Sequence, residues 1–312
     1  MALIEARDLN RTFRVRKRGQ GRSDVVAVRD VSFSIESGEM VGYIGPNGAG
    51  KSTTIKMLTG ILVPTSGDLR VAGMEPSRER TRLARRIGVV FGQRTSLWWD
   101  LPLRDSFSLL HKIYRTDPAR HRANLAEFAD LLDLHDLMDV PVRQLSLGQR
   151  MRGDIAAALL HDPEILYLDE PTIGLDVVSK GRLREFLRAL NASHGVTLML
   201  TTHDLQDIEA LCDRVIVIDH GTLAYDGALA ELRAAGGSSR TLVVDLVDEA
   251  AAIDVPGAIT TRVEGPRQWL SFPSDASAAP IVAAVAAAYD VADLSIQEPD
   301  IEQVIRQLYG RG

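Results

Sequence analysis

The sequence predicts an α/β fold with a small α+β extension at the C-terminal end. A glycine-rich phosphate-binding loop, several short strands that are apolar throughout, and a Gly-Gly-Ser-Ser linker at residues 236–239 support this fold. Strands without a polar face are typical of a parallel sheet that helices cover on both sides. Because the linker separates two differently patterned regions, we expect one domain over residues 1–235 and a small accessory domain over residues 240–312.

The phosphate-binding loop spans residues 45–52 and fits the pattern G-x-x-x-x-G-K-[ST]. Residues 40–44 before it are predicted to form a buried strand, and a helix is expected to begin at Thr53. Glycines let the backbone approach phosphate oxygens closely, and the amides at the helix N-terminus face the anion. The loop therefore predicts a site for a nucleoside triphosphate and Mg²⁺. Its expected nucleotide contacts are Gly45, Pro46, Asn47, Gly48, Ala49, Gly50, Lys51, Ser52 and Thr53.

The composition limits the classes of function. The 312 residues are 45% hydrophobic and 25% charged, as in soluble globular proteins. The formal net charge of −6 argues against nucleic acid as a partner. Cys212 is the only cysteine, so no intrachain disulfide is possible and a reducing compartment is expected. We find no apolar stretch of about 18 residues and no signal-peptide pattern, so any work at a membrane is expected to go through a partner.

The first 35 residues alternate as strands do. We expect one strand over residues 2–15 and two shorter ones over 25–28 and 31–35. The basic segment 14–22 between them is interpreted as a solvated hairpin tip, with attraction to anionic lipid headgroups as the alternative.

Further along, Pro102, Pro118 and Pro141 interrupt helical patterns, and we expect a helical subdomain at about residues 94–160. Residues 165–169 then form an apolar run that ends in Asp169, followed by Glu170. Adjacent carboxylates at the end of a buried strand are costly unless they are paired or used, so this end is expected to meet a site. The other expected strands are 68–71, 87–91, 197–202, 214–219, 222–225, 241–247 and 268–272, and the other expected helices are 77–86, 179–190, 205–212, 281–288 and 300–308.

Four further signals follow the phosphate loop in a fixed order. Gln93 closes the strand at 87–91, Leu-Ser-Leu-Gly-Gln at 145–149 precedes an apolar helix, Asp169-Glu170 closes another strand, and His203 follows a later one. Together these segments resemble the ATP-binding cassette (ABC) family over about residues 3–235. The matched motifs are Walker A (45–52), Q-loop (Gln93), signature (145–149), Walker B (165–169), catalytic Glu170, D-loop (174–176) and switch His203. The resemblance implies a P-loop NTPase fold with a mixed sheet core, an antiparallel β subdomain and a helical signature subdomain.

Two motifs depart from the family pattern. The signature usually reads LSGGQ, and here Leu147 replaces its first glycine. The D-loop usually reads SALD, and here it is Ile173-Gly174-Leu175-Asp176. Ser146, Gly148 and Asp176 are kept, so the departures bear on the rate of the reaction more than on its existence.

The resemblance also implies roles in phosphoryl transfer, which depends mainly on positioning and charge stabilisation. The loop amides and Lys51 would hold the β- and γ-phosphates. Glu170 would polarise the attacking water, with His203 on the γ-phosphate. Taken alone, Gln93 and His203 would each be ordinary strand-edge or surface residues. The remaining assignments are Ser52 and Gln93 as Mg²⁺ ligands, Asp169 on the hydration shell of the metal, Thr53 on the α-phosphate, and Phe13 either as the aromatic that stacks on adenine or as a core residue.

A complete site in this family takes the signature of a second chain. Ser146, Gly148 and Gln149 of one subunit would cap ATP bound to the other, with the dipole of the following helix aimed at the γ-phosphate. The chain has one Walker A motif and one signature, so the resemblance implies a pair of cassettes, most simply a homodimer, whose association depends on ATP.

The resemblance finally implies a separate transmembrane permease, with the cassette peripheral on the cytoplasmic face of the cell membrane. The segment after the Q-loop contains Trp98 and Trp99, which we expect either to anchor the permease interface or to pack inside the helical subdomain. Residues 297–305 resemble the tails of ABC-2 exporters, which favours export. Alternatives are a soluble cassette ATPase of translation or DNA repair, disfavoured by the single cassette and the short 94–160 region, and a P-loop kinase or GTPase, disfavoured by the signature and His203.

Overall fold

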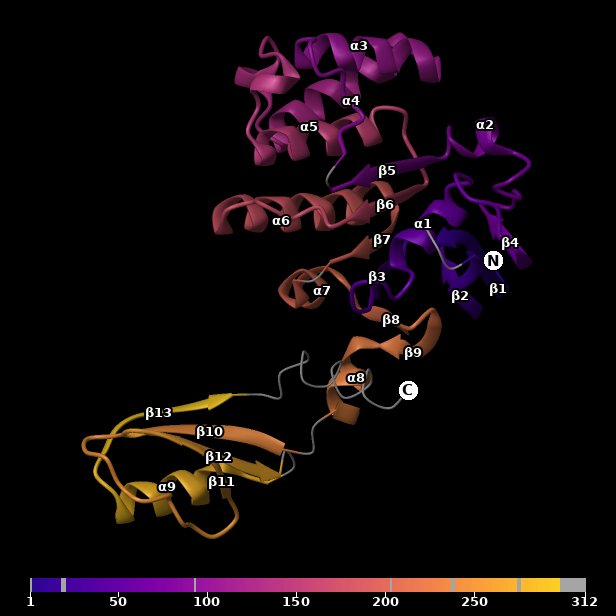
Figure 1. The fold of residues 1–312 in the computed structure, drawn as a ribbon. Helices are drawn as coiled ribbons and strands as arrows, with labels where there is room; N and C mark the ends of the chain where they lie inside the picture. Colours follow the sequence, from indigo (N-terminus) through magenta and orange to yellow (C-terminus); the bar gives the residue numbers. More distant parts are fainter. Residues whose placement is uncertain are drawn as a thin grey trace. The chain divides into compact units, whose positions relative to one another are not determined.

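The computed structural model describes residues 2–17, 21–92, 94–202, 204–236, 239–273 and 276–297. The chain divides into two compact units, Met1–Gly227 and Ala228–Gly312 (Figure 1). The first unit has the predicted α/β architecture and the second is α+β. Within the described ranges, no helix is long and apolar enough to cross a membrane.

A six-stranded sheet forms the centre of the first unit, in the order β5-β6-β7-β3-β8-β9. The five strands from β5 to β8 are paired in parallel. They are buried almost throughout, as the apolar runs predicted. Parallel pairing places the C-terminal ends of these strands on one edge, which is where ligands bind in open α/β sheets. The bounds are β3 Met40–Ile44, β5 Ile87–Phe91, β6 Ile165–Asp169, β7 Thr197–Thr201, β8 Arg214–Asp219 and β9 Thr222–Ala228.

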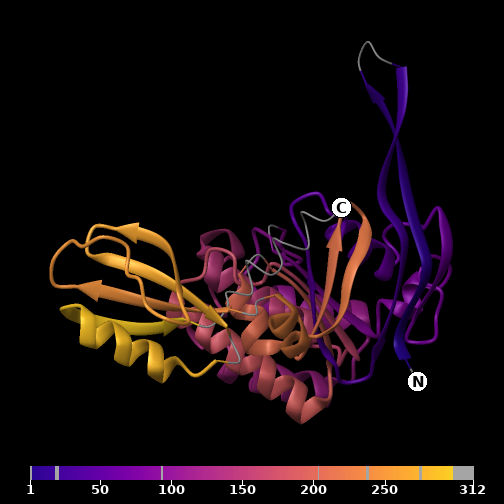
Figure 2. The same cartoon turned by 90° about the horizontal axis from the view of Figure 1, so that it is seen from below.

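A second sheet has the order β2-β1-β4 and is antiparallel. Its strands are β1 (Ala2–Lys17), β2 (Gly21–Glu36) and β4 (Ser66–Val71), and Figure 2 shows β1 and β2 side by side as a long hairpin. The prediction of two short strands at 25–28 and 31–35 is wrong, because β2 continues through a bulge. Asp30 takes a positive φ of 48° there, and the Asn10 side chain accepts from its amide at 3.1 Å.

Helices cover the central sheet and build the predicted helical subdomain (Figure 1). The helix expected over 77–86 is wrong in extent, since α2 spans only Arg80–Leu83. Its charged sequence offers only Leu83 for burial, and a short helix without an apolar face is marginal. The other helices are α1 Lys51–Leu58, α3 Leu103–Tyr114, α4 Pro118–Leu131, α5 Leu147–Leu159, α6 Val177–His194 and α7 Leu205–Leu211, with 3₁₀ turns at His135–Leu137 and Val142–Gln144.

One hydrophobic core joins the antiparallel sheet, α1 and the central sheet. Ile4 and Ile35 come from the hairpin, Tyr43 from β3, and Ile55 and Leu58 from α1, and all are buried. The strand and the helix on either side of the phosphate loop are therefore both anchored in the same core.

The second unit is a four-stranded antiparallel sheet, ordered β11-β12-β10-β13, with its own core. Leu242, Leu270 and Phe272 of the sheet pack with Ile281 and Val285 of α9. The helix expected over 300–308 lies outside the described residues. The bounds are α8 Leu229–Gly236, β10 Ser239–Leu246, β11 Ile259–Glu264, β12 Arg267–Pro273, α9 Ala278–Ala288 and β13 Val291–Gln297.

Candidate active site

The phosphate loop joins β3 to α1, and its glycines pack tightly against neighbouring backbone. A Cβ on Gly45 would lie 2.3 Å from the carbonyl oxygen of Ile218, and one on Gly50 would lie 2.4 Å from that of Ala27. Gly50 also has a φ of 105°, a region that favours glycine. These glycines are therefore needed to let the loop pack against β8 and β2, besides any need to approach a phosphate.

Lys51 begins α1, and its side chain, which folds back against the loop, is only 7% exposed. Its Nζ donates to the carbonyl oxygens of Gly45, at 2.5 Å, and Pro46, at 3.1 Å. Burial lowers the pKa of Lys51, while the nearby charges of Glu170 and Asp169 act in the opposite direction. The positive charge is thus held inside the loop and faces two carboxylates at the end of β6.

Asp169 connects three elements at the C-terminal edge of the sheet. Its Oδ2 accepts a hydrogen bond from the Ser52 hydroxyl at 3.3 Å, and its Oδ1 accepts one from the Thr201 hydroxyl at 2.5 Å. Its carbonyl oxygen accepts from the amide of Gly92, the residue before Gln93, at 2.7 Å. The carboxylate is therefore fixed between the phosphate loop and β7. Thr201 was not predicted as a site residue, because a threonine at a strand end carries no motif.

The donor set at Asp169 and Ser52 fits a magnesium ion. Mg²⁺ prefers oxygen ligands and is usually held by one or two carboxylates together with substrate phosphates. A hydroxyl and a carboxylate at this separation provide such oxygens. Over the described part of the chain, no cluster of three or more His, Cys, Asp or Glu side chains could hold a metal by itself.

Glu170 follows Asp169 in a left-handed backbone conformation, with a φ of 57°. A non-glycine residue held there costs on the order of 1–3 kcal/mol, and such strain clusters at functional sites. The Glu170 amide donates to the carbonyl of Thr201 at 2.9 Å, so the turn is tied to β7. Glu170, Asp169 and Ser52 line one cavity of about 370 Å³, together with Lys56, Ile61, Phe91, Gly92, Arg94 and Ile173.

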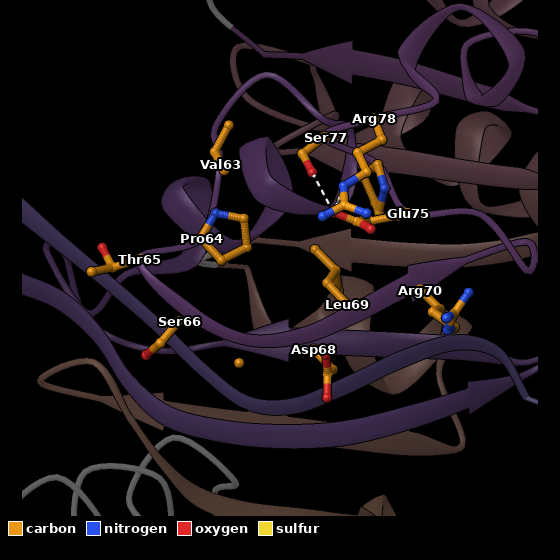
Figure 3. A pocket seen from close by; sticks show the side chains of 12 residues that line it. Val63, Pro64, Thr65, Ser66, Asp68, Leu69, Arg70, Glu75, Ser77 and Arg78 are labelled. Atoms are coloured by element: carbon orange, nitrogen blue, oxygen red, sulfur yellow. Dashed lines mark hydrogen bonds and ion pairs between the residues drawn. The ribbon is translucent and has the colours of Figure 1, made fainter.

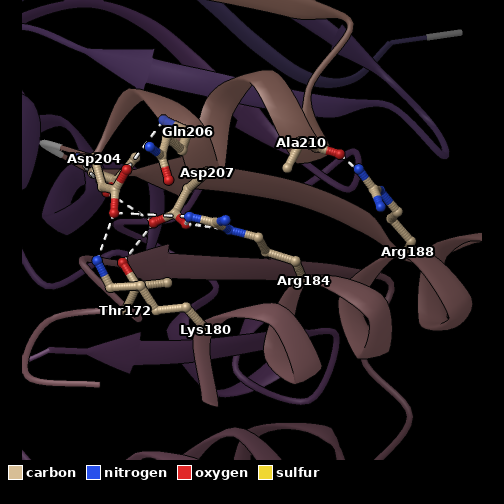
Figure 4. A network of polar contacts seen from close by, with 9 residues as sticks. Thr172, Lys180, Arg184, Arg188, Asp204, Gln206, Asp207 and Ala210 are labelled. Carbon is tan, nitrogen blue, oxygen red and sulfur yellow. Dashed lines mark hydrogen bonds and ion pairs between the residues drawn. The ribbon is translucent and has the colours of Figure 1, made fainter. Parts of the chain in front are cut away.

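A buried polar network supports the turn after Glu170 (Figure 4). The fully buried carboxylate of Asp207 accepts from the hydroxyls of Thr172, at 2.5 Å, and Thr202, at 3.2 Å, and from Nε of Arg184 at 2.7 Å. Thr172 lies two residues after Glu170, and Thr202 directly precedes His203. The sequence motifs did not predict this network, although a carboxylate on the apolar face of α7 was a signal for it.

A second ion pair lies beside this network. Lys180 Nζ donates to Asp204 Oδ2 at 2.6 Å. Partial burial alone would raise the pKa of Asp204, but the hydrogen bond and charge of Lys180 together bring it below its usual range. The N-terminal turn of α6 is thereby tied to the loop that leads into α7.

The signature begins α5 with a capping box. The Ser146 hydroxyl accepts from the amide of Gln149 at 3.2 Å, and Gln149 Oε1 accepts from the amide of Ser146 at 2.9 Å. These residues and Gly148 lie on an element separate from the phosphate loop, and none of the hydrogen bonds among the described residues joins the two. The structure thus brings together Lys51, Ser52, Asp169 and Glu170, and places the signature triplet elsewhere on the first unit.

The roles of three predicted site residues are not tested by the described structure. Gln93 and His203 lie outside the described residues, and their roles are still predictions. Phe13 is half-buried on β1, with the guanidinium of Arg11 at 4.6 Å from its ring centre. Stacking of adenine on Phe13 likewise stays a prediction.

The two adjacent tryptophans after the Q-loop are both on the surface, with 37% of Trp98 and 50% of Trp99 exposed. The alternative that both rings pack inside the helical subdomain is therefore wrong. Asp154 of α5 holds the start of this segment, since its carboxylate accepts from the hydroxyl of Thr95 and from the amide and hydroxyl of Ser96. Burial raises the pKa of Asp154, and these three hydrogen bonds oppose the rise.

A second cavity, of about 320 Å³, lies beside β4 (Figure 3). Residues 63–70 form one wall and residues 75–78 the other. Glu75 accepts from the Ser77 hydroxyl at 2.9 Å and pairs with Arg78 at 3.1 Å. None of the predicted site residues lines this cavity.

A phosphate loop whose lysine faces two carboxylates, at the end of parallel strands, defines a P-loop nucleotide-binding ATPase domain. The family model described as ABC transporter matches residues 28–173. The chain is 31% identical to the "Linearmycin resistance ATP-binding protein LnrL" of Bacillus subtilis, over 95% of this chain and 96% of that protein. It therefore belongs to the ATP-binding proteins of the ABC transporter family and is an ATPase.

Two further similarities extend this assignment. The chain is 40% identical to the "Nod factor export ATP-binding protein I" of Burkholderia orbicola, over 66% of this chain and 67% of that protein. Its fold resembles a dimeric structure of the ATP-binding cassette MJ0796 in a post-hydrolysis state bound to ADP and Pi. That similarity has a TM-score of 0.65 and 28% identity, and it covers 72% of this chain and 98% of the solved chain. Of these similar proteins, the linearmycin-resistance and Nod factor export proteins are of the exporter type.

Proposed function

We propose that this chain is the ATP-hydrolysing subunit of an exporter. It would act on the cytoplasmic face of the cell membrane and power a separate permease by pairing with a second cassette when ATP binds. The observation that supports this most directly is the joint placement of Lys51, Ser52, Asp169 and Glu170 around the end of β6. The names of the relatives, one for linearmycin resistance and one for Nod factor export, favour export as the direction.

In the proposed mechanism the phosphate loop binds and orients the triphosphate. The Lys51 ammonium and the loop amides contact the β- and γ-phosphates, and Thr53 contacts the α-phosphate. Ser52 and Gln93 would bind Mg²⁺, and Asp169 would hold its hydration shell; the ion supplies positive charge that offsets the charge on the phosphates. Because Asp169 is fixed by Ser52 and Thr201, it needs little rearrangement when the nucleotide arrives.

Glu170 is the proposed base that polarises the attacking water, with His203 on the γ-phosphate. Glu170 lies in the strained turn and lines the same cavity as Ser52 and Asp169. The Glu170→Gln variant removes the negative charge and keeps the size of the side chain. We expect it to bind ATP and to lose turnover, measured by nucleotide retention and phosphate release. Turnover near the wild-type rate would show that Glu170 is not the base.

A second cassette would complete each site through Ser146, Gly148 and Gln149. Apolar side chains around the D-loop are well exposed, with Val177 at 86% and Val178 at 64%, which suits a surface that a second chain covers. The Glu170→Gln variant should therefore elute as a dimer with ATP and as a monomer without it. A monomer under both conditions, with ATP bound, would contradict the proposed pairing.

The permease contact is assigned to the exposed pair Trp98 and Trp99. The gene for the membrane subunit is expected beside the gene for this chain, and the two proteins should purify together with ATPase activity that the exported compound stimulates. Replacing both tryptophans with alanine should weaken that association and leave ATP binding by the isolated chain unchanged. Equal recovery of the complex would remove this assignment.

A further inference from the structure

The two motifs that depart from the usual family pattern contact one another through one departing residue of each. Leu147 stands in the signature where glycine is usual, and Gly174 stands in the D-loop where alanine is usual. A Cβ placed on Gly174 would lie 2.2 Å from Cδ2 of Leu147 and 3.3 Å from its Cγ. The Leu147 side chain therefore occupies the space that the methyl group of an alanine would need.

The next residue of each motif makes a similar contact, with the glycine in the signature and the leucine in the D-loop. A Cβ placed on Gly148 of the signature would lie 3.0 Å from Cδ2 of Leu175 in the D-loop. Each segment thus contributes one leucine and one glycine, and each leucine lies over the glycine of the other segment. The contact joins the start of α5 to the turn before Asp176, which caps the start of α6.

The location of this contact suggests a role beyond packing. Leu147 is half-buried and Gly174 is exposed, so neither belongs to the buried core. The signature turn is otherwise fixed by its own capping box, with hydrogen bonds three residues apart. Gly174 lies four residues after Glu170, on the turn that leaves the candidate base.

We propose that Leu147 and Gly174 form a matched pair that couples the signature turn to the D-loop of the same chain. The inference rests on the proposed function, in which Ser146 acts on the ATP of the second chain. Through this pair, the position of Ser146 at one site is linked to the turn after Glu170 at the other. Leu147 and Gly174 are positioning residues, and the chain needs these two departures together.

A double-mutant cycle tests the pair. In Gly174→Ala the added methyl group displaces Leu147, and the positive φ of 71° adds strain. Leu147→Ala frees the space, so the steric part of the effect disappears in the double variant while the strain remains. We expect Gly174→Ala to lower kcat about tenfold when Leu147 is present and only about twofold in the Leu147→Ala background, with little change in the KM for ATP. Equal losses in both backgrounds would overturn the proposal.

Gly181→Ala is the matched control, because that glycine lies on α6 with no heavy atom within 4 Å of a Cβ placed on it, and the variant should keep wild-type activity. The same cycle in the Glu170→Gln background measures ATP-dependent dimerisation, which should show the same dependence on Leu147. Independent losses there would also overturn the pairing. A wild-type chain without ATPase activity would instead refute the proposed function, and thermal unfolding confirms that each variant is folded before the comparison.

Discussion

The catalytic edge of the central sheet and the signature turn at the start of α5 are held in place by different kinds of contact. Asp169 is fixed by hydroxyls from residues 52 and 201, which are far from it in the sequence. The signature turn is fixed by hydrogen bonds between Ser146 and Gln149, three residues apart, and by the Leu147 contact. The catalytic edge thus depends on contacts between distant segments, whereas the signature turn depends mainly on contacts among its own residues.

The largest expected effect is a loss of ATP turnover from a substitution at the catalytic edge. Lys51→Ala removes the positive charge buried inside the loop, and we expect ATP turnover to fall on the order of 100-fold or more. Phosphate release and nucleotide binding by calorimetry measure this. Lys56→Ala, on the same helix and lining the cavity beside Ser52 and Glu170, is the matched control and should retain most of the activity. A similar loss in both variants would mean that general positive charge, and not the position of Lys51, matters.

The network behind the catalytic turn should show the next largest effect. Arg184→Ala leaves the fully buried Asp207 without its charged partner, which we expect to reduce the free energy of unfolding by about 3 kcal/mol. Arg188 lies one turn along the same helix and donates to the carbonyl of Ala210, so Arg188→Ala should cost about 1 kcal/mol or less. Urea unfolding of both variants measures the difference. Equal costs would show that the Asp207 network does not stabilise this edge.

At the signature turn, Ser146 caps α5 and, in the proposed function, contacts the ATP of the second chain. One substitution separates these two roles. Aspartate caps a helix N-terminus as well as serine does, so Ser146→Asp should keep thermal stability within about 1 kcal/mol. Its charge would face the triphosphate bound to the second chain, and ATP-dependent dimerisation should weaken about tenfold or more. Normal dimerisation of this variant would place the signature away from the nucleotide of the partner.

The smallest expected effect is a fall in the melting temperature at acidic pH, caused by His161 just after α5. Burial lowers the pKa of His161, whose Nε2 contacts the carbonyl of Ile87 at 2.9 Å. Because the folded state holds this histidine neutral, its contribution to stability is present above pH of about 6.5 and decreases as the pH falls below that value. The melting temperature should therefore drop between about pH 7.5 and 5.5, and His161→Gln should reduce the drop. An unchanged slope in His161→Gln would mean that other groups cause it.

Local patterns predicted the elements of the fold well. The apolar runs at 87–91, 165–169 and 214–219 are strands with the predicted bounds, because a strand buried on both faces leaves a continuous hydrophobic signal. The prediction failed where a pattern lacked that signal. The charged segment 77–86 has helical composition but little to bury, and a bulge at Asp30 joined two expected strands into one.

The motifs themselves, their order and the ATPase family were determined by the sequence alone, because each motif needs particular residue types at short, fixed spacings. Tertiary structure decided how the motifs are supported. Three contacts depend on the packing of segments that are distant along the chain. They are the close approach of Gly45 and Gly50 to neighbouring backbone, the hydrogen bond from Thr201 to Asp169, and the contact of Leu147 with Gly174. A threonine, a leucine or a glycine in such a place has no local signature, since its role is set by the neighbour that only the folded chain provides.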